Sequence, residues 1–410
     1  MTHAQLPTDR VPHICILGGG FGGLYTAVYA QKFRALRGDR CRITLVEPRS
    51  HFIFSPLLYE LLSDELTPWQ VTPRYETLLA HTRVELKQDA ATQINLKRRQ
   101  VILASETVLT YDYLVVSLGS QTRMVPIPGL KEHAIAFRTL ADVHQVRQRL
   151  DQMRDSRKSA LPVAIIGAGP SGVELACKIG DLLGDRGQVY LIERGSELLT
   201  AFTPSARRVA YKALNKRNVE LLFESSASTI QADRIAVQTS AGERWLDTDL
   251  VLWTAGAALV GWLGDDAVPQ NDRHQCRTRP TLQLPDYPEV FVLGDMADLR
   301  DSKGNAAPNT AQVAYQAADR AAANLNALLT KKPLKPFQYN HLGDMLTLGV
   351  GDALVDSSLG FTLGGLLAGL IRRVVYTYRL PTWGHRLKVA RYGIRTGLKR
   401  LFGKRDGGKG

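Results

Sequence analysis

The feature that most constrains this fold is a glycine pattern that occurs twice. The first copy begins with four apolar residues, 14–17, which predict a buried parallel strand. It continues as Gly18-x-Gly20-x-x-Gly23 and an alanine-rich segment that predicts a helix. Gly18 permits a tight turn, Gly20 lets the backbone approach a diphosphate, and Gly23 lets the helix pack closely on the strand. A diphosphate then lies at the helix N-terminus.

An acidic residue completes the first copy. A second predicted strand, 43–46, ends at Glu47, 24 residues after Gly23. An acid at this place receives the ribose hydroxyls of a dinucleotide. The glycines alone are a weak signal, but strand, glycine turn, helix, second strand and acid follow here in the expected order. We therefore predict a dinucleotide site, with Phe21 and Gly22 among its residues, rather than only a glycine-rich turn.

The second copy is equally complete. A predicted strand at 163–166 leads into Gly167, Gly169 and Gly172, and the next predicted strand ends at Glu193. Two copies predict two nucleotide-binding domains in one chain, whereas a simple dehydrogenase needs only one. We expect an internal relay, in which one site holds a tightly bound flavin and the other a nicotinamide dinucleotide that comes and goes.

Two further predicted strands end at glycine. The segment 111–120 reads as a strand that ends in a small-residue turn with Gly119, and residues 290–293 lead to Gly294 and Asp295. The order of these four motifs resembles that of the flavoproteins with two dinucleotide-binding domains. The resemblance implies that the first pattern binds FAD, the second binds NAD(P)H, and Asp295 binds the flavin ribityl chain. The alternative is that Asp295 is only a turn residue.

The expected fold class is α/β, with two Rossmann-like dinucleotide-binding domains of the glutathione-reductase type. The order of the motifs predicts a discontinuous FAD domain at 1–118 and 282–335 and an NAD(P)H domain at 119–281. Residues 336–410 are expected to form a C-terminal region that contributes to a quinone site and associates with a membrane.

The cysteines limit the electron acceptor. Cys15, Cys41, Cys177 and Cys276 are far apart in the sequence and form no CxxC or CxxxxC pair. The chain therefore lacks the cysteine pairs of disulfide reductases and the reactive cysteines of sulfide:quinone reductases, and no metal site is expected. Cys177 is expected to pack as a small apolar side chain.

Another motif points to a quinone acceptor. The segment that starts at Ala311 places Gln312 and Gln316 on one helix face, with the small Ala314 beside them. Two amide groups can donate hydrogen bonds to quinone carbonyls without becoming charged. The segment resembles the AQxAxQ motif of type II NAD(P)H:quinone oxidoreductases, which implies that this helix start lies between flavin and quinone. The alternative is a polar surface helix capped near Asn309.

The same resemblance covers residues 12 to about 350. It implies that Pro56 and Leu57 pack on the isoalloxazine ring. It also implies that Glu174 approaches nicotinamide and flavin, although Glu174 could instead be a first-turn acid that complements the helix dipole. Leu342 stands where many members carry a lysine.

The motifs together give three sets of expected site residues. The expected catalytic residues are Glu174, Gln312 and Gln316. The expected FAD residues are Gly18, Gly20, Phe21, Gly22, Gly23, Glu47, Pro56, Leu57, Gly119, Gly294, Asp295, Ala311 and Gln312. The expected NAD(P)H residues are Gly167, Gly169, Pro170, Ser171, Gly172, Glu174, Glu193, Arg194 and Gly256.

The implied function is non-pumping electron transfer. A hydride passes from NAD(P)H to tightly bound FAD, and two electrons then pass to a membrane quinone. Glu193 favours the ribose diol of NADH and repels a 2′-phosphate, while Arg194 could pair with that phosphate, so we expect NADH with NADPH open. The segments 341–356 and 379–385 look most like the cyanobacterial and plastid branch, which includes demethylphylloquinone reductases. The acceptor is accordingly expected to be demethylphylloquinone or a respiratory or thylakoid quinone.

The net charge is concentrated in the tail. The formal net charge is +13, and +11 of it lies in residues 371–410. Residues 357–371 are uncharged but reach only about 22 Å as a helix, against about 30 Å of hydrocarbon, so they could form a hairpin, dimerise or lie in an interface. After Pro381 a helical stripe of apolar side chains is flanked by cations, which is typical of an interfacial helix on anionic lipid. The stripe comprises Trp383, Leu387, Ala390, Ile394, Leu398 and Leu401, with Lys388, Arg391, Arg395 and Lys399 on one side and Arg386 and Arg400 on the other.

We therefore expect a peripheral protein on the cytoplasmic face of a membrane, thylakoid or plasma membrane if the source is cyanobacterial. It would contact an anionic surface through residues 357–402, form a homodimer and bind no nucleic acid. One alternative is that the basic helix packs on the body with a solvated polar face. Two others concern function: a soluble reductase of a small acidic electron-transfer protein, and a flavin-bound redox sensor.

Overall fold

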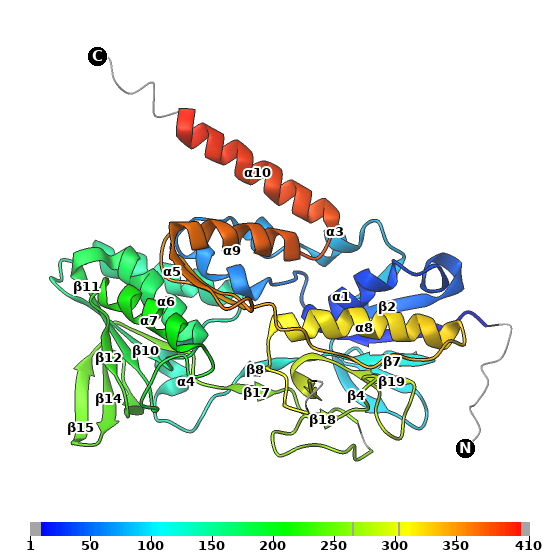
Figure 1. The fold of residues 1–410 in the computed structure, drawn as a ribbon. Coiled ribbons are helices and arrows are strands. Elements are labelled where there is room, and N and C mark those ends of the chain that lie inside the picture. Colours follow the sequence, from blue (N-terminus) through cyan, green and yellow to red (C-terminus); the bar gives the residue numbers. More distant parts are fainter. Residues whose placement is uncertain (1–9, 265, 302–303, 403–410) are drawn as a thin grey trace. The chain divides into compact units, whose positions relative to one another are not determined.

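The computed structural model describes residues 10–264, 266–301 and 304–402, with side chains up to residue 396. The chain forms two compact units, drawn in Figure 1. Unit 1 comprises Met1–Phe52, Pro73–Gln121 and Ala258–His341, and unit 2 comprises Ile53–Thr72, Thr122–Ala257 and Leu342–Gly410.

The boundaries of these units differ from the domain boundaries that the motif order predicts. Residues 53–72, expected in the FAD domain, belong to unit 2, and residues 258–281, expected in the NAD(P)H domain, belong to unit 1. Most of the expected C-terminal region belongs to unit 2. The two cofactor domains stay predictions, because the units are defined by packing and not by bound cofactors.

Unit 1 is built on a five-stranded parallel sheet with the order β3-β2-β1-β7-β19. All five residues of the central strand β1 are buried, as expected for a parallel strand covered on both faces. Helices α1 (Phe21–Ala30) and α8 (Ala311–Leu329) lie side by side, and the alanine-rich face of α8 is buried (Figure 1). The strands are β1 (His13–Leu17), β2 (Arg42–Val46), β3 (Val84–Lys87), β7 (Tyr113–Val116) and β19 (Val290–Val292).

Smaller elements complete unit 1. A three-stranded antiparallel sheet and a two-stranded parallel pair accompany the main sheet. These are β4 (Ala91–Asn95), β5 (Gln100–Leu103), β6 (Val108–Thr110), β18 (Cys276–Arg277) and β20 (Ala297–Asp298), with α3 (Tyr75–Leu79) and 3-10 turns at Arg34–Leu36, Gly38–Arg40 and Gly294–Met296. The chain also passes between the units within two short strands, β8 (Ser120–Thr122) and β17 (Ala257–Leu259), besides the boundaries after Phe52, Thr72 and His341.

Unit 2 repeats the same architecture, with the parallel order β12-β11-β10-β16-β9. Its central strand β10 is buried throughout and leads into α6, as β1 leads into α1. The sheet consists of β9 (Ala134–Ala136), β10 (Leu161–Ile166), β11 (Gly187–Ile192), β12 (Glu220–Leu222) and β16 (Leu250–Trp253). The helices are α2 (Pro68–Val71), α4 (Leu130–His133), α5 (Leu140–Asp155), α6 (Pro170–Leu183) and α7 (Pro204–Asn215), with 3-10 turns at Ser55–Leu57, Tyr59–Leu61 and Gly184–Arg186. A separate antiparallel sheet contains β13 (Ser226–Ile230), β14 (Arg234–Thr239) and β15 (Gly242–Asp247).

The C-terminal part of unit 2 contains three antiparallel strands and two helices. The strands β21 (Asp344–Thr347), β22 (Ala353–Asp356) and β23 (Thr362–Gly365) precede α9 (Leu366–Arg379), and α10 (Trp383–Phe402) follows, in orange and red in Figure 1. The helix expected after Pro381 is present. The uncharged stretch 357–371 supplies a β-hairpin turn, β23 and the first residues of α9, a helix that the periodicity did not predict.

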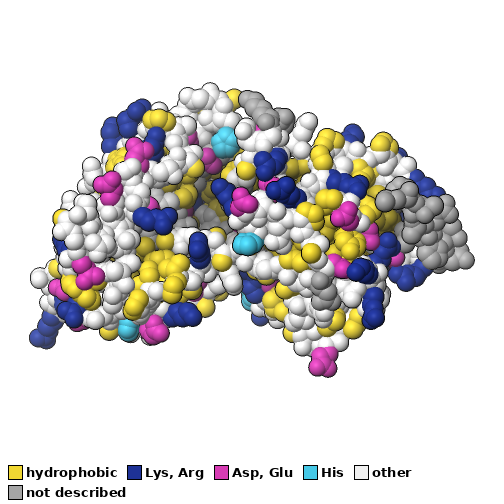
Figure 2. Space-filling model, turned by 90° about the horizontal axis from the view of Figure 1, so that it is seen from below, with side chains coloured by type: hydrophobic (Ala, Val, Ile, Leu, Met, Phe, Trp, Pro, Cys, Tyr) yellow, Lys and Arg dark blue, Asp and Glu magenta, His cyan; other side chains and the backbone are white. Residues whose placement is uncertain are grey.

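Two surface properties bear on the tail. Among the described residues, no helix combines the length and the hydropathy that a membrane crossing requires. On the face shown in Figure 2, positive and negative side chains are interspersed. That mixture agrees with the small net charge that the sequence leaves outside the tail.

The third glycine of each pattern lies against the carbonyl oxygen of the first. A Cβ on Gly23 would lie 1.9 Å from the oxygen of Gly18, and a Cβ on Gly172 would lie 1.8 Å from that of Gly167. Gly18 and Gly167 also have φ angles of +90° and +103°, which other residues rarely adopt. Each helix can therefore approach its strand this closely only with glycine at both places.

We expect Gly172→Ala to destabilise the protein by roughly 1–3 kcal/mol, because the added methyl group must displace backbone. Gly384→Ala in α10 is the matched control, since a Cβ there meets no atom within 4 Å. Alanine should favour that helix by about 1 kcal/mol or less. Thermal unfolding of both variants beside the parent measures the difference. An unchanged midpoint for Gly172→Ala would contradict the close packing.

Candidate functional site

The first glycine pattern leaves the N-terminus of α1 open. Gly20 is the N-cap residue, and a Cβ there would meet no atom within 4 Å. The backbone N–H groups of the first turn have no partner within the helix and form an anion-binding end. Phe21 and Gly22 lie in that turn. The space and the donors fit the diphosphate of a dinucleotide.

Glu47 is held rigidly at the end of β2. Its Oε2 accepts a hydrogen bond from the backbone N–H of Gly19 at 2.7 Å, and its Oε1 accepts one from the backbone N–H of Arg49 at 3.0 Å. The Arg49 guanidinium donates to both carboxylate oxygens. Burial alone would raise the pKa of Glu47, but the hydrogen bonds and charge of Arg49 outweigh it and lower the pKa. The carboxylate is therefore charged and positioned to accept ribose hydroxyls.

The second pattern has the same geometry. Gly169 caps α6, a Cβ there would meet no atom within 4 Å, and Pro170 occupies the first helical position, where no N–H bond is lost. Glu193 accepts hydrogen bonds from the backbone N–H of Ala168 at 2.7 Å and of Gly195 at 2.8 Å. In both units the acid thus accepts a hydrogen bond from the backbone N–H of the residue that follows the first glycine. Ser171 and Gly172 lie in the first turn of α6, and Arg194 and Gly256 are exposed.

Asp295 lies in unit 1 beside the start of α8. Gly294 and Asp295 line a shallow pocket together with Asn309 and Thr310. The Asp295 Oδ2 accepts a hydrogen bond from the Ser120 hydroxyl at 2.5 Å. Thr310, rather than Asn309, caps α8, with its hydroxyl oxygen accepting the backbone N–H of Val313. Gly119 and Ala311 belong to the same unit.

The two glutamines of α8 contact Tyr339 and Asn340, at the start of the segment in which Leu342 replaces the lysine of many family members. The Tyr339 hydroxyl donates to Gln312 Oε1 at 2.9 Å. Two hydrogen bonds join the Gln316 amide to the backbone of Asn340. Nε2 donates to the Asn340 carbonyl oxygen at 2.9 Å, and Oε1 accepts the Asn340 N–H at 3.1 Å. The family resemblance covers the segment from Asn340 onward but not Tyr339, and it did not predict these contacts with α8.

A buried cluster of charged residues lies within unit 2. The Arg372 guanidinium of α9 binds Glu60, donates to the Pro56 carbonyl oxygen at 2.5 Å and lies 3.5 Å from Glu174 Oε1. The Arg372, Glu60 and Glu174 side chains are 5–8% exposed. Pro56 and Leu57 form the 3-10 turn of this cluster and belong to unit 2. Sequence reasoning missed Glu60 and Arg372, which are 312 positions apart.

Burial governs the protonation of this cluster. Desolvation raises the pKa of Glu174 to about 7, although Arg372 and a 2.9 Å hydrogen bond from the Thr347 N–H favour the charged form. Desolvation also raises the pKa of Tyr59 well above its usual value, and its hydroxyl donates to Ser171 at 3.0 Å. Glu174 lies beyond the first turn of α6 and is buried, so the alternative of a first-turn acid that complements the helix dipole is wrong. Its carboxyl group can gain or lose a proton near neutral pH.

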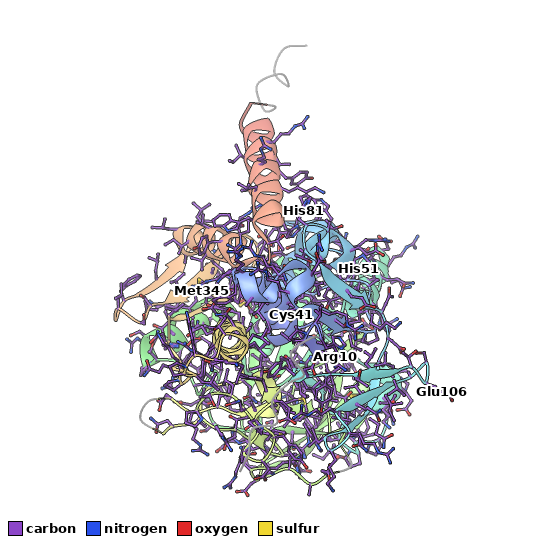
Figure 3. The ribbon with its side chains drawn as sticks, turned by 90° about the vertical axis from the view of Figure 1, so that its right-hand side faces the viewer. Arg10, Cys41, His51, His81, Glu106 and Met345 are labelled. Atoms are coloured by element: carbon purple, nitrogen blue, oxygen red, sulfur yellow. The ribbon has the colours of Figure 1, made fainter. Side chains whose placement is uncertain are left out.

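All four cysteines are free and buried. Burial raises the pKa of Cys15, Cys41 and Cys177 to about 12 and that of Cys276 to about 11. Cys41 is labelled in Figure 3. The nucleophilic thiolate form is therefore suppressed at every cysteine, which agrees with an acceptor other than sulfur.

Comparison with known proteins gives the family of the chain. The family described as pyridine nucleotide-disulphide oxidoreductase matches residues 12–318. Demethylphylloquinone reductase of Synechocystis sp. is 41% identical over 386 residues, which cover 93% of this chain and 95% of that protein. Alternative NAD(P)H-ubiquinone oxidoreductase C1, chloroplastic/mitochondrial, of Arabidopsis thaliana is 37% identical over 93% of this chain and 80% of its own.

A solved structure shows the same fold. The structure of NDH2 from Plasmodium falciparum in complex with NADH superposes with a TM-score of 0.82. The match covers 96% of this chain and 99% of that chain at 19% identity. At this identity the likeness concerns the fold alone.

The raised pKa of Glu174 predicts a pH-dependent stability. Between the usual value of 4.5 and about 7, the folded protein keeps a proton that the unfolded chain has lost. The contribution of Glu174 to stability therefore falls as the pH rises through this window and is level above it. We expect Glu174→Gln to remove this component, as measured by chemical unfolding at pH 5, 6, 7 and 8.

Glu65→Gln is the comparison variant for Glu174→Gln, because the pKa of Glu65 is shifted in the opposite direction. Burial would raise the pKa of Glu65, but Lys178 outweighs it and lowers the pKa. This variant should change stability mainly at neutral pH, where the parent has a charged Glu65, and less as the pH falls below the usual value. A Glu174→Gln variant with the same pH dependence as the parent would contradict the buried titration.

Proposed function

The chain belongs to the pyridine nucleotide-disulphide oxidoreductase family and, within it, to the type II NAD(P)H:quinone oxidoreductases, and we propose that its acceptor is a naphthoquinone such as demethylphylloquinone. It is a flavoprotein oxidoreductase that transfers electrons from NAD(P)H to a quinone. The transfer from a nicotinamide to a flavin is supported by the two complete glycine patterns, each with its acid, in one chain. The 41% identity to a demethylphylloquinone reductase supports the naphthoquinone.

Unit 1 is the proposed FAD-binding part. The open N-terminus of α1 would hold the diphosphate, the charged Glu47 would accept the ribose hydroxyls, and Asp295 would bind the ribityl chain. When bound, FAD accepts a hydride from the nicotinamide and passes two electrons to the quinone. Pro56 and Leu57 are proposed to pack on its ring, and the hydrogen bond from Arg372 fixes the turn that carries them.

Unit 2 is the proposed nicotinamide-binding part, with NADH preferred. The N-terminus of α6 would hold the diphosphate. Both carboxylate oxygens of Glu193 are held by backbone N–H groups, so the charge stays at the end of β11. A carboxylate there accepts the ribose diol of NADH and repels the 2′-phosphate of NADPH. Arg194 is exposed, so water would screen its attraction for the phosphate.

Glu174 is proposed to hold and release a proton during turnover. Quinone reduction to quinol consumes protons, and a carboxyl with a pKa near neutrality can exchange them at working pH. Oε1 accepts the Thr347 N–H, and the carboxyl group also forms a hydrogen bond with the Tyr59 side chain. The Arg372 guanidinium favours the charged form of this carboxyl group, whereas the neighbouring Glu60 disfavours it.

Gln312 and Gln316 are the proposed acceptor-binding amides. Gln312 lies in the first turn of α8 and is half-buried. Its amide can donate to a quinone carbonyl without charge. Both groups of the Gln316 amide pair with Asn340, so we assign Gln316 chiefly to holding this end of the site.

The membrane association is proposed from exposed apolar stripes on α9 and α10. Each helix turns one face into unit 2, with Arg372 and Ala368 buried on α9 and His385 and Val389 buried on α10. That packing covers only the inner face of α10, so the apolar stripe stays outward. The exposed apolar side chains are Leu366, Leu367, Leu370, Val374 and Tyr378 of α9 and Trp383, Leu387, Tyr392 and Ile394 of α10. Leu398, Lys399, Arg400 and Leu401, also expected in this pattern, lie outside the described side chains.

An anionic bilayer surface fits these stripes. Lys388, Arg391 and Arg395 are exposed beside the apolar side chains of α10. Apolar side chains enter the headgroup region while neighbouring cations meet anionic lipid, at about 1 kcal/mol per cation. A quinone with an apolar tail dissolves in the same membrane. We propose a peripheral association on the cytoplasmic side, and the homodimer stays a prediction that light scattering can test.

The alternatives have less support. A reductase that docks a small acidic protein by charge would leave the apolar stripes of α9 and α10 uncovered. The two curated relatives described above carry names of quinone reductases rather than of redox sensors. Turnover with a quinone separates all three functions.

The decisive assay is quinone reduction by the purified FAD-loaded protein. We expect rapid oxidation of NADH with a short-chain naphthoquinone and a kcat/KM for NADH at least about tenfold above that for NADPH, because Glu193 repels the 2′-phosphate. No quinone reduction would overturn the proposed function. A tenfold preference for NADPH would overturn only the nicotinamide assignment.

The membrane proposal is tested with point variants, because deleting the tail would also remove the buried Arg372. We expect the double variant Leu387→Asp, Ile394→Asp to lower co-sedimentation with vesicles containing anionic lipid by about tenfold or more, since both side chains are exposed on the α10 stripe. The control is Val11→Asp, Val108→Asp, which makes the same change at exposed positions of unit 1. Equal binding by the two double variants would refute the α10 surface.

A further inference from the structure

The amide of Gln312 is oriented by a neighbour that the AQxAxQ resemblance does not include. The Tyr339 hydroxyl donates to Gln312 Oε1 at 2.9 Å, within unit 1. An amide has one accepting end and one donating end. Because Oε1 is turned toward Tyr339, the opposite end of the amide is Nε2, which carries N–H donors and accepts nothing.

His341 extends this arrangement. Its Nδ1 lies 3.1 Å from the Tyr339 oxygen, and the two rings meet at 62° with centroids 6.2 Å apart. When Nδ1 carries the proton, it donates to the tyrosine oxygen, and the tyrosine proton is then directed to Gln312. His341 is exposed and Tyr339 half-buried, so the row of hydrogen bonds runs from the surface to the start of α8.

The backbone of this segment is fixed independently of the two rings. Gln316, one turn after Gln312, pairs with both the N–H and the carbonyl oxygen of Asn340. This two-point contact holds residue 340 against α8. Tyr339 is therefore kept beside Gln312 by a bond that does not involve its own side chain.

We propose that Tyr339 is a positioning residue that makes Gln312 a hydrogen-bond donor toward the acceptor and so favours binding of the quinone over the quinol. The proposal rests on the assignment of Gln312 to the acceptor site. The carbonyl oxygens of a quinone only accept hydrogen bonds, whereas a quinol hydroxyl also presents a donor. The Nε2 donor pairs with the quinone carbonyl, but it offers no acceptor to the quinol O–H, which must rotate away from it. The site therefore binds the oxidised substrate more tightly than the reduced product.

Tyr339→Phe in the FAD-loaded protein tests this directly. Phenylalanine keeps the ring and removes the donor, so the Gln312 amide can turn its oxygen toward the ligand. We expect the KM for a short-chain naphthoquinone to rise about threefold to tenfold and the inhibition constant of the corresponding naphthoquinol to fall by a similar factor. The rate with ferricyanide, which needs no amide, should be unchanged. A purely structural role would move both acceptors together.

Three further variants serve as controls. Tyr211→Phe removes a hydroxyl in unit 2, where the ring contacts Phe223, and should leave both constants unchanged. His341→Ala should shift both constants in the direction of Tyr339→Phe. His341→Asn restores a donor near the position of Nδ1 and should recover most of the loss. Because His341 is exposed, these variants keep the proposal testable if Tyr339→Phe fails to bind FAD.

Gln312→Leu distinguishes a failure of the proposed acceptor site from a failure of the orienting role of Tyr339. If this variant reduces naphthoquinone with the KM of the parent, the proposed acceptor site is wrong. If it raises the KM while Tyr339→Phe leaves the ratio of KM to the quinol inhibition constant unchanged, the site stands and the orienting role of Tyr339 is refuted. A raised ratio in Tyr339→Phe together with a raised KM in Gln312→Leu supports both.

Discussion

Both nucleotide sites depend on one close contact, in which the third glycine of a pattern lies on the carbonyl oxygen of the first. That contact brings α1 onto β1 and α6 onto β10 with no side chain intervening. The helix N-terminus then opens beside the strand end, and the acid of the next strand reaches the backbone N–H after the first glycine. Diphosphate donors and ribose acceptor are thus set by the same few atoms.

A buried arginine gives the C-terminal segment its place in unit 2. Arg372 of α9 binds Glu60, the Pro56 carbonyl and, at 3.5 Å, Glu174. A buried charge is costly unless an opposite charge lies beside it. If α9 were displaced, Glu60 and Glu174 would remain buried without the Arg372 guanidinium. The basic tail is therefore part of the enzyme's packing on its inner face. Its outer face carries the apolar stripes that we assign to a membrane.

The sequence predicted elements whose signals are local. The strands before each glycine pattern, the acids Glu47 and Glu193 and the helix after Pro381 were found from spacing within a few tens of residues, and the structure contains each of them. The helix α9 was missed because Gly369 and the uncharged stretch that runs into the helix obscured the period. The contact of Glu60 with Arg372 was missed because 312 positions separate the two residues, although the family resemblance covers the segment that contains Glu60. The contact of Tyr339 with Gln312 was missed because no motif marks Tyr339.

The sequence by itself determined the family, the two nucleotide sites and the concentration of positive charge in the tail. These follow from residue identity and short spacing, because a glycine turn, a strand end and an amphipathic period are encoded within one supersecondary unit. Only the tertiary structure decided that Glu174 is buried beside Arg372 and has a pKa of about 7, and that Tyr339 turns the Gln312 amide. Both depend on which distant segments pack together, since desolvation and hydrogen-bond direction are properties of that packing and not of any local pattern.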